Sequence, residues 1–289
     1  MADGEQSRGR ALPRSEATSE LTARAASAAV LGAVTLLVTY LGGLPFALFW
    51  LVAAIAVVIE WTTIARVEPR VPLQVVLSLG LALLTGAYLM GLWGGIVLAV
   101  MLVVVAAVAA VAATRRDRLW ATAGLACAAI LVLGLMAVRN HPGLGLAGVL
   151  WTFAVVWTTD VAAYFVGRRV GGPKLWPRVS PKKTWSGFAG GLAAGTAAGV
   201  VLPLAASRWG VTLPAGLAGI AAVSALASVV GQLGDLAESA LKRRFGVKDS
   251  SNLIPGHGGV MDRLDALWAV ALMMGLILAG ARLAELDFN

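Results

Sequence analysis

The chain has 289 residues, of which 59% are hydrophobic and 13% are charged, and its formal net charge is +8. Soluble domains carry about 25% charged residues, so this composition excludes an ordinary soluble globule and also a disordered chain. An intrachain disulfide is excluded because the sequence has a single cysteine, Cys127. The apolar residues fall in blocks of about twenty between short polar stretches, which is typical of a polytopic membrane protein.

We predict an all-α bundle of about nine transmembrane helices. Residues 1–24 are expected to form a disordered cytoplasmic tail, residues 25–140 the N-terminal membrane helices, and residues 141–289 a catalytic C-terminal region. The expected spans are residues 25–42, 44–65, 72–91, 93–113, 119–138, 146–166, 187–206, 213–234 and 264–283.

The distribution of basic residues predicts the orientation of these spans. All 23 Lys and Arg residues except Arg139, Arg208 and Arg282 fall on one side of the predicted bundle. Because basic loops stay in the cytoplasm, we expect a cytoplasmic N-terminus, an external C-terminus, and cytoplasmic loops at 167–186 and 235–263. This surplus explains the positive net charge without nucleic acid as a partner.

A stripe of glycines marks the span at 187–206. Gly187, Gly191, Gly195 and Gly199 recur every four residues, so one helix face allows close approach by a neighbouring helix. We favour packing within the bundle, with a homodimer interface as the alternative.

Two acidic residues are expected within membrane spans, where a charge costs about 2.5 to 3.5 kcal/mol on insertion scales and is usually paired or functional. Asp160 is expected either to pair with Arg168 or Lys182 or to act directly in chemistry. Glu60, near the cytoplasmic end of its span, is expected to pair with Arg66 or to reach the membrane interface.

The richest group of polar residues lies between 235 and 265. Asp235, Ser239 and Lys242 are spaced i, i+4 and i+7 and share a helix face, while Asp262 and Asp265 share the start of the next helix. Two helix ends that bear carboxylates can hold Mg²⁺, which prefers oxygen ligands. Positive charge for phosphate oxygens comes from the neighbouring basic side chains of Lys242, Lys248 and Arg263.

A glycine cluster precedes the second helix of this group. Gly256, Gly258 and Gly259 flank His257, so backbone N–H groups can approach an anion just before a helix N-terminus. The density of acidic, basic and glycine residues at one membrane face favours metal-assisted phosphoryl or nucleotidyl transfer.

Three stretches of this region resemble a known family. They are SALKR at 239–243 with KD at 248–249 and HGGVMDRLD at 257–265, DVAAYFVGR at 160–168, and SPKKTWSG at 180–187. Together they closely resemble the signature of the phosphatidate cytidylyltransferases, the CDP-diacylglycerol synthases, over roughly residues 155–270. Ser186 departs from the pattern, because the family usually has Glu after the Trp.

The resemblance implies that CTP and phosphatidate react to give CDP-diacylglycerol and pyrophosphate, with Mg²⁺ required and a second cation as an option. It also implies that Asp235 and Asp262 hold the metal and that Lys242 works between them as the third catalytic residue. Lys182 and Lys183 would grip the triphosphate or the lipid phosphate. The other residues expected to contact or orient the substrates are Ser239, Arg243, Lys248, Asp249, His257, Gly258, Gly259, Arg263, Asp265 and Asp160.

One substrate is then a lipid of the bilayer and the other is cytosolic, so we expect a multi-pass protein of the inner (plasma) membrane with its active site at the cytoplasmic face. A lateral opening between helices would admit the lipid. The alternatives are a CTP-dependent kinase of a lipid alcohol such as a polyprenol or phytol, and an ion-coupled transporter that uses Asp160 and Asp235 as ion ligands.

Overall fold

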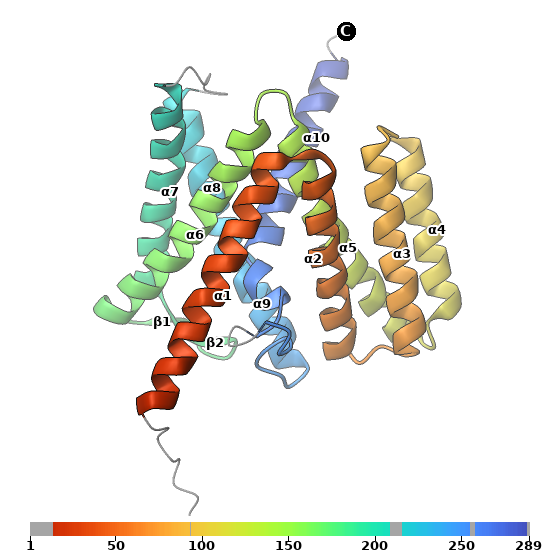
Figure 1. Ribbon diagram of the computed structural model, residues 1–289, viewed down its shortest axis with the longest axis horizontal. Helices are drawn as coiled ribbons and strands as arrows, with labels where there is room; N and C mark the ends of the chain where they lie inside the picture. The colour runs from red at the N-terminus through yellow and green to blue at the C-terminus, as the bar shows by residue number, and fades with distance from the viewer. Residues whose placement is uncertain (1–13, 93, 209–215, 255–257, 288–289) are drawn as a thin grey trace, which may run out of the picture.

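The structure, a computed structural model, describes residues 14–92, 94–208, 216–254 and 258–287. Within these ranges the chain forms ten α-helices and one two-stranded sheet (Figure 1). The helices are α1 (Arg14–Leu41), α2 (Gly43–Ile64), α3 (Arg70–Leu89), α4 (Gly95–Val111), α5 (Arg115–Asn140), α6 (Gly145–Val170), α7 (Trp185–Ser207), α8 (Leu217–Arg244), α9 (Met261–Leu264) and α10 (Leu267–Asp287).

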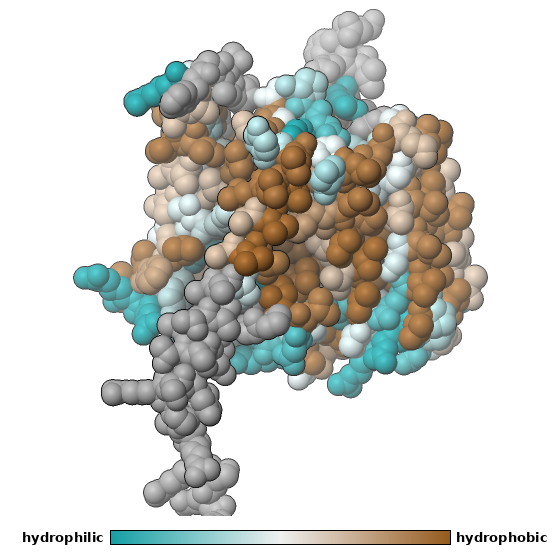
Figure 2. Space-filling view, viewed as in Figure 1, coloured by the Kyte–Doolittle hydropathy of each residue, from teal (hydrophilic) through white to brown (hydrophobic). Residues whose placement is uncertain are grey.

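Each of the nine predicted spans coincides with a helix, and the tenth helix, α9, is a single turn. In the described part of the chain, six helices are long and apolar enough to cross a membrane: α2, α3, α5, α6, α7 and α8. The apolar stretches of α1, α4 and α10 are shorter. Apolar side chains cover the middle of the visible face, and polar side chains gather toward its ends (Figure 2). These features define a helical protein with several membrane spans.

The N-terminal segment expected to be a tail is only partly described. Helix α1 begins at Arg14, so residues 14–24 are helical and continuous with the first predicted span. Residues 1–13 lie outside the described ranges.

The prediction of an all-α chain is wrong for the segment between α6 and α7. Strand β1 (Lys174–Trp176) pairs antiparallel with β2 (Ser180–Thr184), with Lys174 opposite Thr184. Pro173, Pro177 and Pro181 exclude a continuous helix here, because proline lacks the N–H that a helix interior needs. The hairpin lies near the end of the bundle where α1 begins, and α10 ends at the opposite side (Figure 1).

The glycine stripe of α7 packs within the bundle, which confirms the favoured interpretation. All four of its glycines are buried. A Cβ atom at Gly191 would lie 2.9 Å from the Thr159 carbonyl oxygen of α6, and one at Gly187 would lie 2.7 Å from the Ala163 carbonyl oxygen. The bare face therefore lets α7 lie directly against the backbone of α6, the helix that carries Asp160.

Candidate functional site

One face of α8 carries predicted site residues together with a further carboxylate, Glu238. Asp235, Glu238 and Lys242 project from its last turns, and the Ser239 hydroxyl lies 3.4 Å from Asp235 Oδ1. The helix ends just beyond them, because Gly246 adopts a left-handed conformation with φ of 71° and its N–H bonds back to the Arg243 carbonyl. This stop places the charged face at the end of the bundle rather than in its apolar middle.

Lys242 is held between two carboxylates. Its Nζ lies 2.7 Å from Glu238 Oε2 and 2.6 Å from Asp262 Oδ1. The side chains are 11%, 3% and 9% exposed for Lys242, Glu238 and Asp262 in turn, so both ion pairs are largely shielded from solvent. Lys242 therefore touches Asp262, as expected, but its second partner is Glu238 rather than Asp235.

Asp235 instead forms an ion pair with Lys183, which the β hairpin brings to α8. Helix α7 starts next to this lysine, where the Thr184 hydroxyl accepts a hydrogen bond of 3.1 Å from the Gly187 N–H and caps the helix. Lys182, its neighbour in β2, is exposed. The two adjacent lysines thus have different surroundings, and Lys183 alone contacts Asp235.

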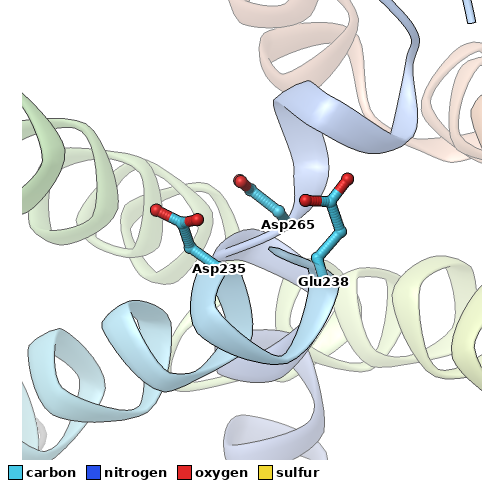
Figure 3. Close-up of side chains that lie close together, drawn as sticks. All are labelled: Asp235, Glu238 and Asp265. Atoms are coloured by element: carbon cyan, nitrogen blue, oxygen red, sulfur yellow. The ribbon is translucent and has the colours of Figure 1, made fainter. Parts of the chain in front are cut away.

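Three carboxylates converge beside this ion pair. Oxygen atoms of Asp235, Glu238 and Asp265 all lie within 4.8 Å of one another (Figure 3). Helix α8 approaches the start of α10 closely at Gly234, where a Cβ atom would lie 2.6 Å from the Asp265 carbonyl oxygen. This close approach brings Asp265, rather than Asp262, toward Asp235.

Asp262 is surrounded by hydrogen-bond donors. It accepts bonds from the Ser250 N–H (2.9 Å), the Gly259 N–H (2.9 Å) and the Lys242 ammonium. Burial by itself would raise the pKa of Asp262, but the hydrogen bonds from Lys242, Gly259 and Ser250 outweigh it and lower the pKa to about 2. Asp262 is therefore ionised near neutral pH and holds the Lys242 ammonium by an ion pair.

The glycine loop before α9 is packed against two carboxylates, those of Asp262 and Glu60. Gly258 has φ of 79°, and a Cβ atom on it would lie 2.8 Å from Asp262 Oδ2. Gly259 is buried, and a Cβ atom there would lie 2.6 Å from Glu60 Oε1. His257, predicted to line the phosphate cradle, lies outside the described residues.

The prediction for Glu60 is wrong. This residue of α2 is 2% exposed, and its carboxylate accepts hydrogen bonds from the backbone N–H groups of Val260 and Met261 at 2.9 and 2.8 Å. It also accepts one from the Ser251 hydroxyl at 2.6 Å. Glu60 therefore contacts the loop of the candidate site rather than Arg66 or the membrane interface.

A cavity of about 1240 Å³ opens beside the carboxylates. One part of its wall is apolar and comes from α1, α2 and α6, including Leu31, Phe49 and Phe153. The other part is polar and contains predicted site residues: Asp160, Lys182, Lys183, Asp235, Asp262, Arg263 and Asp265. A single cavity thus joins a surface suited to hydrocarbon with one suited to phosphates.

Other predicted residues lie outside this wall, as far as the chain is described. Arg243, Lys248 and Asp249 are exposed, and Arg243 donates to the Val247 carbonyl oxygen. Asp160 and Arg168 both line the cavity, and Arg168, one of the partners expected for Asp160, donates to the Tyr164 hydroxyl. At the position of the family departure, the Ser186 hydroxyl donates to the Gly171 carbonyl oxygen, so it ties α7 to the end of α6.

Two acidic residues of the site were not among the predicted set. Glu238 stands three residues after Asp235 and four before Lys242, a spacing that already places all three on one helix face. For Glu60 the available signal was a lone carboxylate in an apolar span, which indicates a partner without identifying it.

Comparison with known proteins identifies the family of the chain. Residues 22–280 match the model of the cytidylyltransferase family, so the chain belongs to that family, and the resemblance seen in the motifs is confirmed. A phosphatidate cytidylyltransferase of Brucella suis biovar 1 (strain 1330) is 42% identical over 272 residues, which are 93% of this chain and 96% of the relative. One of Bacillus subtilis (strain 168) is 38% identical over 142 residues, 49% of this chain and 51% of the relative.

Proposed function

We propose that the chain is a phosphatidate cytidylyltransferase that converts CTP and phosphatidate into CDP-diacylglycerol and pyrophosphate, a step of phospholipid biosynthesis. Family membership and a full-length relative of that name support the proposal. The observation that carries it in the structure is the cavity, whose apolar wall and charged wall suit a diacyl lipid with an anionic head group.

The chemistry requires two polyanions to meet in line. A phosphate oxygen of phosphatidate attacks the α-phosphorus of CTP, the bond from that phosphorus to the bridging oxygen of the β-phosphate breaks, and pyrophosphate leaves. No covalent intermediate with the protein is needed. The protein must position both substrates and balance their charge, which is the usual source of rate in phosphoryl and nucleotidyl transfer.

We assign different roles to the basic side chains of the site. Lys182, Lys183 and Arg263 are among the basic residues that line the cavity, and we assign them to phosphate oxygens of CTP or of the lipid. Lys242 is fixed between Glu238 and Asp262, of which Asp262 lines the cavity, and we assign Lys242 to the transferring phosphates. Ser239, Asp160, Gly258 and Gly259 orient the ligands and their neighbours. The roles expected for Arg243, Lys248, Asp249 and His257 stay predictions.

The donor set fits Mg²⁺. Asp235, Glu238, Asp262 and Asp265 are four carboxylates, and the ion pairs described for them include those with the ammonium groups of Lys183 and Lys242. Oxygen atoms of Asp235, Glu238 and Asp265 lie within 4.8 Å of one another, an arrangement that suits a hard cation. When bound, Mg²⁺ would neutralise phosphate oxygens.

Asp235 and Asp265 offer oxygens for the metal. A second cation, which the resemblance leaves as an option, stays a prediction. Asp262 sharing the metal with Asp235 stays a prediction, because its oxygens already accept bonds from Lys242, Ser250 and Gly259.

We further propose that all nine long helices cross the bacterial plasma membrane, with the N-terminus and the active site on the cytoplasmic side and the C-terminus outside. The distribution of Lys and Arg supports this orientation, as does the requirement for cytosolic CTP. A homodimer would have to use a surface other than the glycine stripe of α7, which is buried against α6.

Product analysis tests the function. Purified protein in mixed micelles should release pyrophosphate from CTP only when phosphatidate and Mg²⁺ are both present. Release of CDP with a polyprenol or phytol as acceptor would instead identify a lipid-alcohol kinase. Transport that depends on an ion gradient, without any turnover of CTP in detergent, would identify the transporter.

A further inference from the structure

Glu60 joins two parts of the chain that are far apart in sequence. Its carboxylate is almost completely buried, and the groups that donate to it belong to residues 190 to 201 positions later. A buried carboxylate is costly unless its oxygens accept enough hydrogen bonds, and Glu60 meets this condition with donors from a single loop.

The donors come from both ends of that loop. Ser250 and Ser251 stand six and seven residues beyond the end of α8, where this part of the loop begins, whereas Val260 and Met261 stand where it enters α9. Each Glu60 oxygen takes one hydroxyl and one backbone N–H: Oε1 those of Ser251 and Val260, and Oε2 those of Ser250 and Met261. One side chain of α2 therefore holds the beginning and the end of the loop together.

The same two loop ends carry the donors of Asp262. The Ser250 and Gly259 N–H groups bond to its carboxylate, and the Ser250 hydroxyl lies 2.9 Å from Asp262 Oδ2 and 3.0 Å from Glu60 Oε2. This hydroxyl has one proton, so it can donate to only one of the two acids at a time. Glu60 and Asp262 are thus neighbours that share one set of donors.

We propose that Glu60 is a positioning residue of the transfer reaction. By holding the ends of the loop, it sets the location of Asp262 and, through Asp262, that of the Lys242 ammonium. This inference rests on the proposed function, because it assumes that Asp262 and Lys242 act on the transferring phosphates. Helix α2, from the N-terminal half of the chain, would then contribute a positioning residue to the active site.

Glu60→Gln is the direct test. The amide keeps the volume, but its NH₂ group faces donors and cannot accept their hydrogen bonds. We expect kcat to fall about 10- to 100-fold, as is common when the support of a catalytic group is lost, with KM for CTP changed by less than about threefold. Amide hydrogen exchange should speed up in peptides that contain Ser250 and Gly259 and stay unchanged in peptides from α5.

Thr62→Val is the matched control. Thr62 lies two residues further along α2 and is completely buried, and its hydroxyl accepts a hydrogen bond of 3.0 Å from Gln74 of α3 rather than one from the loop. The variant should lower the thermal midpoint while it keeps kcat and the exchange of the loop peptides. An equal loss of kcat in Thr62→Val and Glu60→Gln would overturn the proposal, because destabilisation of α2 would then explain both.

Ser251→Ala covers the case in which Glu60→Gln does not fold. It removes one of the donors to Glu60 and keeps the others, so a fall in kcat of about two- to fivefold with faster exchange near Ser250 is expected. Full activity of folded Ser251→Ala and Glu60→Gln, or of Ser251→Ala alone when the other cannot be purified, would overturn the proposal. A wild-type protein without cytidylyltransferase activity would refute the proposed function, whereas the exchange comparison would still report on the contact.

Discussion

Replacement of Lys242 by Met separates its role in folding from its role in catalysis. The substitution keeps an unbranched side chain of similar length and removes the ammonium group that lies between Glu238 and Asp262. The two carboxylates, 3% and 9% exposed, then face each other without the cation that was 2.7 and 2.6 Å from them.

The magnitude follows from this burial. Removal of one partner from a buried ion pair typically costs about 3 to 5 kcal/mol of stability, because the remaining charge is left without compensation. Lys242 serves two acids, so the upper part of that range applies unless one acid takes up a proton. In Glu238→Met/Lys242→Met only Asp262 stays charged, and the N–H groups of Ser250 and Gly259 still bond to it. The double variant should therefore recover most of the lost stability.

Thermal unfolding in detergent and steady-state kinetics in mixed micelles measure the two effects. We expect Lys242→Met to lose about 10² to 10³ in kcat, as happens when a charged group at a transfer site is removed, and the double variant to remain inactive. Lys242→Arg should also be poor, because a planar guanidinium cannot replace a compact ammonium between two carboxylates. Near-normal kcat in Lys242→Met or Lys242→Arg, or a double variant as unstable as the single one, would refute this reasoning.

Three further predictions concern the metal, the lysines and the membrane. Asp235→Asn and Asp262→Asn should each reduce turnover about 10²- to 10³-fold in folded protein, and unchanged rates in both would remove them from the catalytic set. Lys182→Ala should raise KM for CTP or phosphatidate and leave kcat near wild type, because its contact is equally strong in the ground and transition states; a kcat defect at saturation would contradict this. A cysteine at Asn252 should be protected from an impermeant thiol reagent in intact cells and one at Asn289 labelled, with Cys127 replaced by Ser as background, and the reverse pattern would invert the topology.

The helices could be predicted from the sequence because the bilayer imposes length and hydropathy on each span. The stretch at 174–184 could not, since its prolines exclude a helix but do not dictate which residues pair. The glycine stripe also allowed a prediction from the sequence. Four small residues on one helix face favour close approach by a neighbouring helix, whichever helix that is.

The sequence predicted many of the residues of the candidate site, but it did not predict which of them contact one another. Asp262 and Asp265 were expected to share one helix face, but the chain divides there into α9 and α10. Asp262 consequently faces Lys242 while Asp265 faces Asp235. The contact between Glu60 and the loop depends on how α2 packs against α9 in the folded chain, so no local pattern in the sequence could identify it.

The central claim is cytidylyl transfer from CTP to phosphatidate. The most direct test is to determine which phosphorus of CTP enters the lipid product. Purified protein is incubated with phosphatidate, Mg²⁺ and CTP labelled at either the α- or the γ-phosphorus, and the lipid phase is separated by chromatography. The proposed reaction places the α-label in a nucleotide lipid and leaves the γ-label in water-soluble pyrophosphate. A lipid that carries the γ-label, or a lipid phase free of both labels, would contradict cytidylyl transfer by this protein.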